Sequence, residues 1–167
     1  MKILTILFIT VVFALNVFAQ GSWRKMTEAE LKRSVPEKAP VIKENIETEF
    51  RTASGITDGK SNILGVVIIT AGYEADGKYT HFFKTAAGIK VGDLSLAKGE
   101  YIFGYQRLDA ETLRVTFYKA NDGELVGATK AKVEKSKGAI YSFLIAPPTD
   151  KKGKIFIGRF TFEYSLE

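Results

Sequence analysis

Apolar and polar residues alternate along most of the chain beyond residue 43. Ile46, Thr48 and Phe50 alternate with charged residues, which is the two-residue period of a half-buried strand. Ile42, Ile46 and Phe50 are also spaced by four, as in a helix, but the β-like sequence downstream favours the strand. Seven further runs rich in β-branched and aromatic residues follow, over residues 62–70, 78–85, 99–108, 112–119, 124–133, 139–146 and 154–166.

Turn residues separate most of these runs. Asp-Gly and related pairs favour tight hairpins because glycine and aspartate tolerate positive φ. Such pairs occur at residues 58–59, 76–77, 121–123, 137–138 and 152–153. Many short strands joined by hairpins are typical of an antiparallel sandwich or barrel. The sequence therefore predicts one all-β domain, either a β-sandwich or a strongly curved β-barrel of about eight strands.

Large aromatic side chains recur at every second position in two of the runs. They are Tyr101, Phe103 and Tyr105 in residues 99–108 and Phe156, Phe160, Phe162 and Tyr164 in the last strand, residues 154–166. Side chains two apart share one face of a strand, so each set faces one side of the sheet. Such aromatics usually fill a core, but a small barrel can also hold one apolar molecule. The residues expected at such a ligand site are Tyr101, Phe103, Phe160 and Phe162.

The first residues have the pattern of an export signal. Lys2 precedes an apolar stretch over residues 3–15, and Val17 and Ala19 are the small residues expected before a cut by signal peptidase. We expect residues 1–19 to be a cleaved signal peptide, with the cut after Ala19. An uncleaved anchor is the alternative, but the segment of about 17 residues is short for a membrane span. Cleavage would leave no membrane-spanning segment and a protein in the periplasm or outside the cell.

A polar arm, residues 20–43, is expected between the signal and the β domain, residues 44–167. Within it, Thr27 and Glu30 form a capping box pattern, which predicts a helix from Glu28 to about Ser34. Pro36 would end this helix, because the residue before proline avoids the helical region. Leu31 and Val35 are the expected apolar contacts of this helix.

Composition and motifs exclude several kinds of chemistry. Cysteine is absent and histidine occurs once, so a zinc site of about four His and Cys ligands cannot be assembled. The net charge of +5 is too mild to indicate a nucleic-acid partner. No Gly-x-Ser-x-Gly elbow and no phosphate-binding glycine loop occurs, so we expect no catalytic residue, no metal and no cofactor. His81, without a partner nearby in sequence, is interpreted as a strand histidine at the sheet surface.

Residues 89–101 resemble a pattern found in exported bacterial β domains of unknown function. In that pattern, V-x-G-x-x-L-x-x-G-x-Y, a short strand leads through a turn into a core strand. The matching positions are Gly92, Leu96, Gly99 and Tyr101, with Gly92 displaced by one. The resemblance extends over about residues 60–120. It implies export and a β domain, and it implies no particular chemistry.

Three functional hypotheses follow from these patterns. The first is a non-catalytic secreted or periplasmic domain that acts as a binding or structural accessory module, with a protein or a cell-envelope component as partner. The second is a carrier of a small apolar ligand in a β cup, which requires an open cavity of roughly 300 Å³ or more. The third is a carboxylate-based hydrolase, which requires two acids converging in a cleft.

Overall fold

The computed structural model describes residues 22–70, 78–136 and 138–167. The predicted signal peptide and its cleavage site lie outside these residues. The described chain contains one short helix and thirteen strands. The strands are β1 (Arg24–Lys25), β2 (Lys38–Val41), β3 (Glu44–Thr57), β4 (Asn62–Ile68), β5 (His81–Thr85), β6 (Ile89–Val91), β7 (Leu94–Leu96), β8 (Gly99–Arg107), β9 (Thr112–Lys119), β10 (Leu125–Val133), β11 (Tyr141–Ile145), β12 (Lys152–Gly158) and β13 (Phe160–Leu166). The all-β class is confirmed, and the expected number of about eight strands is too low.

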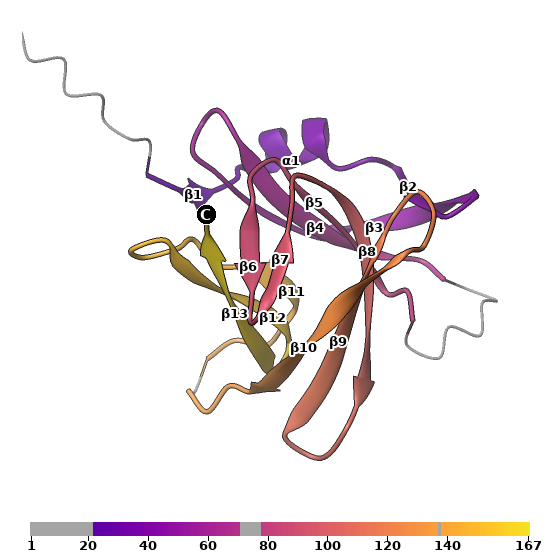
Figure 1. The fold of residues 1–167 in the computed structure, drawn as a ribbon. Helices are drawn as coiled ribbons and strands as arrows, with labels where there is room; N and C mark the ends of the chain where they lie inside the picture. Colours follow the sequence, from indigo (N-terminus) through magenta and orange to yellow (C-terminus); the bar gives the residue numbers. More distant parts are fainter. Residues whose placement is uncertain (1–21, 71–77, 137) are drawn as a thin grey trace, which may run out of the picture.

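The strands form one antiparallel sheet that curls into a half-barrel (Figure 1). Along its main path the order is β1-β3-β4-β5-β8-β9-β10-β13-β12-β11. The curl brings β11, the last strand of this path, back against β3 and β4. There the backbone N–H of Ile145 donates a 2.9 Å hydrogen bond to Oγ of Ser54, and both residues are buried. The last strand of the path, β11, is therefore held against β3 by contacts that include the Ser54 side chain.

The inner face of the curl holds the main core. Tyr101 and Phe103 on β8 and Leu113, Val115 and Phe117 on β9 are buried there, as their alternation predicts. The Phe103 and Phe117 rings of these neighbouring strands have centroids 5.0 Å apart, and the Phe103 ring also lies 6.1 Å from that of Phe143 on β11. Burying large apolar side chains in this way is the dominant contribution to the stability of such a fold.

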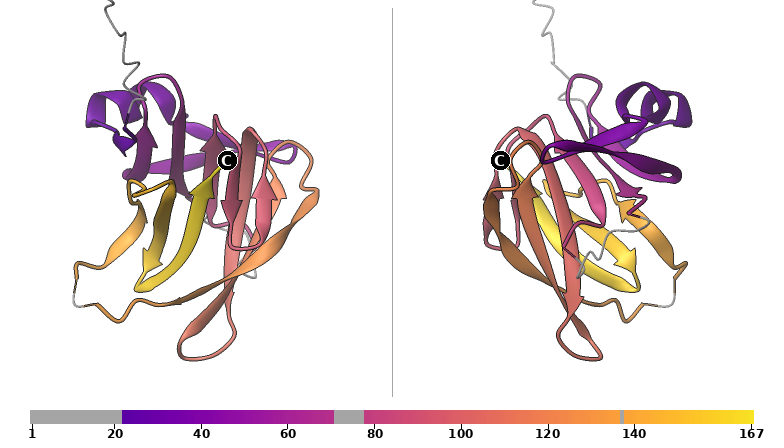
Figure 2. Two further views of the ribbon diagram at one scale, coloured as in Figure 1. Left: turned by 60° about the vertical axis from the view of Figure 1, so that its left-hand side comes forward. Right: turned by 90° about the vertical axis from the view of Figure 1, so that its right-hand side faces the viewer.

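A second core lies on the outer face of the sheet. Helix α1 (Glu28–Ser34) and strand β2 lie outside the curl, over the first strands of the sheet (Figure 2). The helix has the predicted bounds and capping box: the Glu30 N–H donates to Oγ1 of Thr27, and the Thr27 N–H donates to the Glu30 carboxylate. The segment also contributes Met26, Ala39 and Val41 to this core. Leu31 and Val35, the expected apolar contacts of the helix, both pack at this core.

The expected single strand over residues 154–166 is two strands. β12 and β13 form a hairpin in which Ile157 pairs with Phe160 across a two-residue turn at Gly158 and Arg159. Gly158 has φ of 60°, a conformation that glycine adopts without strain and that suits the first position of a tight hairpin turn. The reversal places Ile155 and Ile157 in the main core with Phe160 and Phe162, and Phe156 does not share that face.

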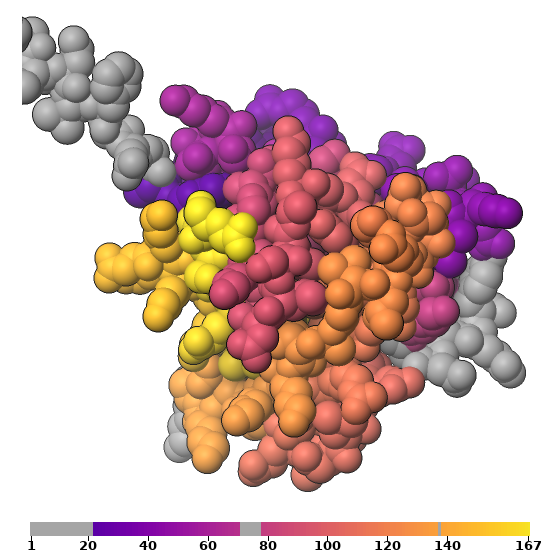
Figure 3. Space-filling view, viewed as in Figure 1, coloured from indigo at the N-terminus to yellow at the C-terminus, as the bar shows by residue number. Residues whose placement is uncertain are grey.

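Residues 89–96 form a small hairpin of their own, β6 and β7, joined by a turn at Gly92, whose φ is 59°. β6 pairs with β13, and the hairpin lies on the face shown in Figure 3, between the C-terminal strand and β10. Short hairpins of this kind account for the extra strands. Within the described ranges, α1 is the single helix, and it is too short to cross a bilayer.

Candidate functional site

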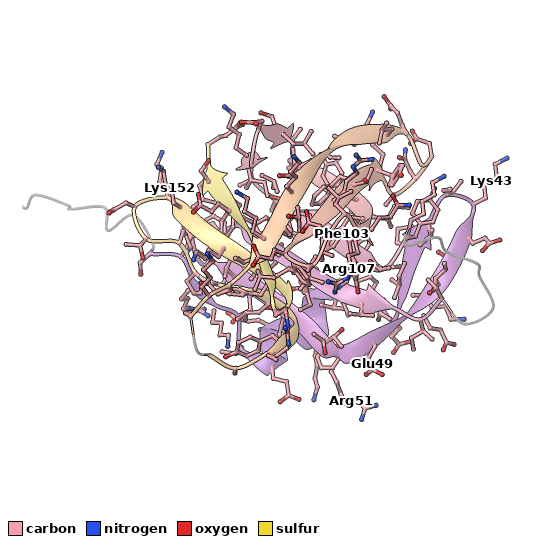
Figure 4. The ribbon with its side chains drawn as sticks, turned by 90° about the horizontal axis from the view of Figure 1, so that it is seen from below. Lys43, Glu49, Arg51, Phe103, Arg107 and Lys152 are labelled. Atoms are coloured by element: carbon pink, nitrogen blue, oxygen red, sulfur yellow. The ribbon has the colours of Figure 1, made fainter. Side chains whose placement is uncertain are left out.

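One end of the half-barrel is hollowed by an open cavity of about 740 Å³. It lies where β8 ends, β9 begins and the β12–β13 hairpin turns. Figure 4 looks along the barrel from below and shows Phe103 and Arg107 near the middle of the curl. The described residues that line the cavity are Val67, Ile68, Thr70, Thr80, His81, Tyr105, Arg107, Leu113, Ile140, Ser142, Ile157, Gly158, Arg159 and Phe160.

His81 is the most deeply buried polar side chain of the lining, with 3% of its surface exposed. Its ring stacks on that of Phe103, with centroids 4.6 Å apart, and lies 5.1 Å from the ring centroid of Phe143. Burial among these rings lowers the pKa of His81 to about 3, because removal from water disfavours the charged imidazolium. The imidazole is therefore neutral at physiological pH.

One nitrogen of this imidazole lacks a partner. Nδ1 lies 2.8 Å from Oγ1 of Thr80, whereas Nε2 is buried and has no hydrogen-bond partner among the described residues. Thr80 Oγ1 also lies 3.2 Å from the Phe103 carbonyl oxygen, so its single proton can go to that oxygen or to Nδ1. In the first case Nε2 is an acceptor, and in the second it is a donor. A buried polar atom of either kind is costly to leave unpaired.

Two arginines also line the cavity. The guanidinium of Arg107, at the end of β8, lies over the ring of Phe160, with its central carbon 5.1 Å from the ring centroid. It also donates a 3.3 Å hydrogen bond to the carbonyl oxygen of Ala110. Arg159 occupies the β12–β13 turn, next to Phe160 in the chain. Arg107, Arg159 and Phe160 therefore all line the same cavity.

These positive charges lack acidic neighbours in the described part of the lining, which contains no Asp or Glu. The described ion pairs lie elsewhere and involve neither arginine. Glu49 pairs with Arg51 at 3.1 Å on β3, and Figure 4 shows both side chains at the periphery, away from Arg107. The rest of the described cavity wall is mostly apolar, with hydroxyl groups from Thr70, Thr80, Tyr105 and Ser142.

The structure separates the four expected ligand-binding residues. Phe160 lines the cavity, whereas Tyr101, Phe103 and Phe162 belong to the main core behind it. Tyr101 additionally donates a 2.8 Å hydrogen bond to the Ala97 carbonyl oxygen. The curl therefore leaves the end of the barrel open while its middle is filled.

The interpretation of His81 as a surface histidine is wrong. Its strand, β5, is central in the sheet, and Phe82 and Phe83 beside it are fully buried on opposite faces. His81 therefore lies at a part of β5 that is buried on both faces of the sheet. His81, Arg107 and Arg159 are the cavity residues that sequence reasoning missed, and an isolated histidine within an apolar strand was the signal available for the first of them.

The chemical groups of the cavity suit recognition. Two guanidiniums, four hydroxyls and a neutral imidazole can hold a polar group, and the apolar wall can hold a hydrocarbon body. A carboxylate pair of the kind used by glycosidases is not among the described lining residues. Across residues 22–70, 78–136 and 138–167, no cluster of three or more potential metal-ligating side chains occurs.

The chain was compared with known proteins at three levels. No protein-family model matches the sequence, no curated protein matches it, and no solved structure matches the fold.

Proposed function

We propose that this protein is an exported, non-catalytic binding domain that holds a small molecule in the cavity at the open end of its half-barrel. The proposal places the mature protein in the periplasm or outside the cell, after removal of residues 1–19. The observation that carries it is the cavity of about 740 Å³, whose lining includes His81, a buried residue with an unpartnered Nε2. That volume lies within the range of about 300–1,000 Å³ typical of small-molecule sites.

The apolar part of the wall supports this function over a purely structural role. Leu113, Ile157 and Phe160 are buried side chains that line the cavity, and Ile140 lines it with 69% of its surface exposed. A domain that served only as a spacer would gain stability by filling this space with its own side chains. A bound molecule with an apolar body would cover the same surface and would be stabilised by the transfer of that body from water.

The unpartnered Nε2 of His81 gives further support to a binding function. A ligand hydroxyl, amine or carbonyl that reaches Nε2 would satisfy the one buried side-chain atom without a partner among the described residues. Replacing an unsatisfied group by a hydrogen-bonded one is worth about 1–3 kcal/mol. The apo protein therefore carries a cost that binding would remove.

A dye displacement assay tests the proposal. The full chain, exported and processed by a bacterial host, is first examined by native mass spectrometry for a retained small molecule. It is then titrated with N-phenyl-1-naphthylamine, an uncharged dye whose fluorescence rises in apolar sites. We expect one saturable site, together with retained mass that denaturation releases.

Two tryptophan substitutions on exposed serines localise the site. Ser142 lines the cavity and is exposed, so Ser142→Trp should obstruct the cavity without disturbing the core and weaken dye binding by about tenfold or more. Ser95, an exposed residue on β7 away from the cavity, gives the matched control Ser95→Trp, which should bind as the parent does. Unchanged dye binding by the Ser142→Trp variant, or no saturable binding by the parent, overturns the proposal.

A further inference from the structure

The charge inside the cavity is unbalanced. Its described lining contains two guanidinium groups and no carboxylate, and the buried imidazole of His81 there is neutral. Arginine stays protonated at all relevant pH values, so the described lining of the cavity carries positive charge whether or not a ligand is bound. Near low-dielectric walls such a charge attracts an anion more strongly than it would in open solvent.

The position of Arg107 leaves donors free for a ligand. Its guanidinium lies over the Phe160 ring at 5.1 Å, and one of its nitrogens, Nη1, bonds to the Ala110 carbonyl oxygen. Stacking uses the flat face of a guanidinium, whereas its five N–H groups project from the edge. The Phe160 ring and the Ala110 carbonyl therefore orient this group while leaving part of its edge available.

Arg159 lies in the two-residue turn between β12 and β13 and also lines the cavity. The two-residue hairpin fixes its backbone between paired strands, and its N- and C-terminal neighbours, Gly158 and Phe160, both line the cavity. Its backbone carbonyl accepts a 2.8 Å hydrogen bond from the Glu134 N–H, which further anchors the turn. Arg107 and Arg159 both line the cavity, and the N–H groups of a guanidinium can hold an oxyanion through charge-assisted hydrogen bonds.

The wall next to these arginines is apolar. Leu113 lies directly opposite Arg107 in the β8–β9 pairing, and Ile157 lies opposite Phe160 in the β12–β13 pairing. Both are buried side chains of the main core that also line the cavity. A bare inorganic anion would leave this surface exposed to water, whereas a hydrocarbon chain would cover it.

From these contacts we infer that the cavity binds an amphipathic anion, with its carboxylate or phosphate end on Arg107 and Arg159 and its hydrocarbon body along Leu113, Ile157 and Phe160. The inference rests on the proposed binding function and adds the chemical class of the ligand. The acid end lies toward the mouth, where both arginines are exposed, and the hydrocarbon body lies toward the buried wall.

The experiment compares ligands that share a chain length and differ in charge. Decanoate, decyl phosphate, decanol and inorganic phosphate each compete with N-phenyl-1-naphthylamine on the full, processed protein at pH 7.5. We expect decanoate or decyl phosphate to displace the dye at concentrations about tenfold or more below those of decanol. The ratio of the concentrations at which decanoate and decyl phosphate displace the dye shows whether a carboxylate or a phosphate end is preferred. Inorganic phosphate should not displace the dye.

Arginine variants assign the effect to the cavity. Arg107→Gln and Arg159→Gln should each reduce the preference for the acid over decanol, and the double variant should abolish it while still binding the dye. Arg114→Gln is the matched control, because Arg114 is an exposed arginine on β9 beside Leu113 that does not line the cavity. Addition of salt should weaken the binding of decanoate and decyl phosphate and leave the binding of decanol unchanged, since salt screens exposed charges.

Each outcome bears on one of the two proposals. The inference of an anionic ligand is overturned if decanol competes as well as the acids, or if the double variant still prefers the acids. Either result leaves the binding function in place. Displacement by inorganic phosphate alone overturns the amphipathic ligand. No saturable dye binding by the parent overturns the binding function itself.

Discussion

The imidazole of His81 lies parallel to the ring of Phe103, with 6° between the planes and 4.6 Å between the centroids. The two residues face each other across the β5–β8 pairing, so the backbone register itself brings the rings together. A neutral imidazole behaves here as an aromatic core residue with one satisfied nitrogen. Its other nitrogen, Nε2, is buried without a hydrogen-bond partner among the described residues.

Stability should fall as the solution becomes acidic. The pKa of His81 is about 3 in the folded protein and about 6.5 in the unfolded chain. Below pH 6.5 the unfolded state takes up a proton that the folded state does not, so the free energy of unfolding decreases by about 1.4 kcal/mol per pH unit. Urea unfolding between pH 7 and pH 5 measures this slope in a range where most carboxylates stay ionised.

The His81→Phe variant is the control for the pH slope. Phenylalanine preserves the stack on Phe103 and removes the unpartnered nitrogen, and the adjacent cavity can take the added volume. We expect a variant about as stable as the parent at pH 7, or up to about 2 kcal/mol more stable, with the slope between pH 7 and pH 5 largely lost. A slope that persists in the variant would show that another group is responsible.

The fastening of β11 to β3 depends on Ser54. Its hydroxyl oxygen accepts the buried N–H of Ile145, and alanine would leave that donor without a partner. We expect Ser54→Ala to lower the free energy of unfolding by about 1–3 kcal/mol. Ser61 is a half-buried serine in the β3–β4 turn, and Ser61→Ala should lower the free energy of unfolding by much less. Chemical denaturation measures both, and equal losses would argue against a special role for the Ser54 hydroxyl.

Gly65 marks the closest approach of β11 to β4. A Cβ atom placed there would lie 2.6 Å from Cε1 of Phe143, well inside contact distance. Gly65→Ala should therefore destabilise the fold by about 1–3 kcal/mol through overpacking. Phe143→Leu removes the obstructing ring, so in its background Gly65→Ala should cost clearly less. Additive losses in this double-mutant cycle would contradict the packing of β11 on β4.

The capping box of α1 should contribute measurably to stability. Thr27→Ala removes the hydroxyl that caps the Glu30 N–H and should cost about 1 kcal/mol. Glu28→Gln, which removes only the exposed ion pair with Lys32, should cost less. Denaturation curves of the two variants are compared directly, and a Thr27→Ala loss no larger than that of Glu28→Gln would mean that α1 docks without its cap.

Local features of the chain were predictable from sequence because they depend on neighbouring residues. Thr27 and Glu30 determine the start of α1 through hydrogen bonds three residues apart, and the alternation of Leu113, Val115 and Phe117 determines a strand and its buried face. The all-β class follows from the repetition of such strands. The hairpin at Gly158 was missed because a glycine and an arginine between two apolar runs also resemble the interior of one long strand.

The candidate site depended on the tertiary structure. His81, Arg107 and Arg159 come from three strands or turns that are far apart in sequence and meet only because the sheet curls. The curl also decides that Phe103 and Phe162 fill the core while Phe160 borders open space. Sequence periodicity determines which residues share a face of a strand, but curvature and register decide which of those faces is filled and which is left open, and these arise from the packing of the whole sheet.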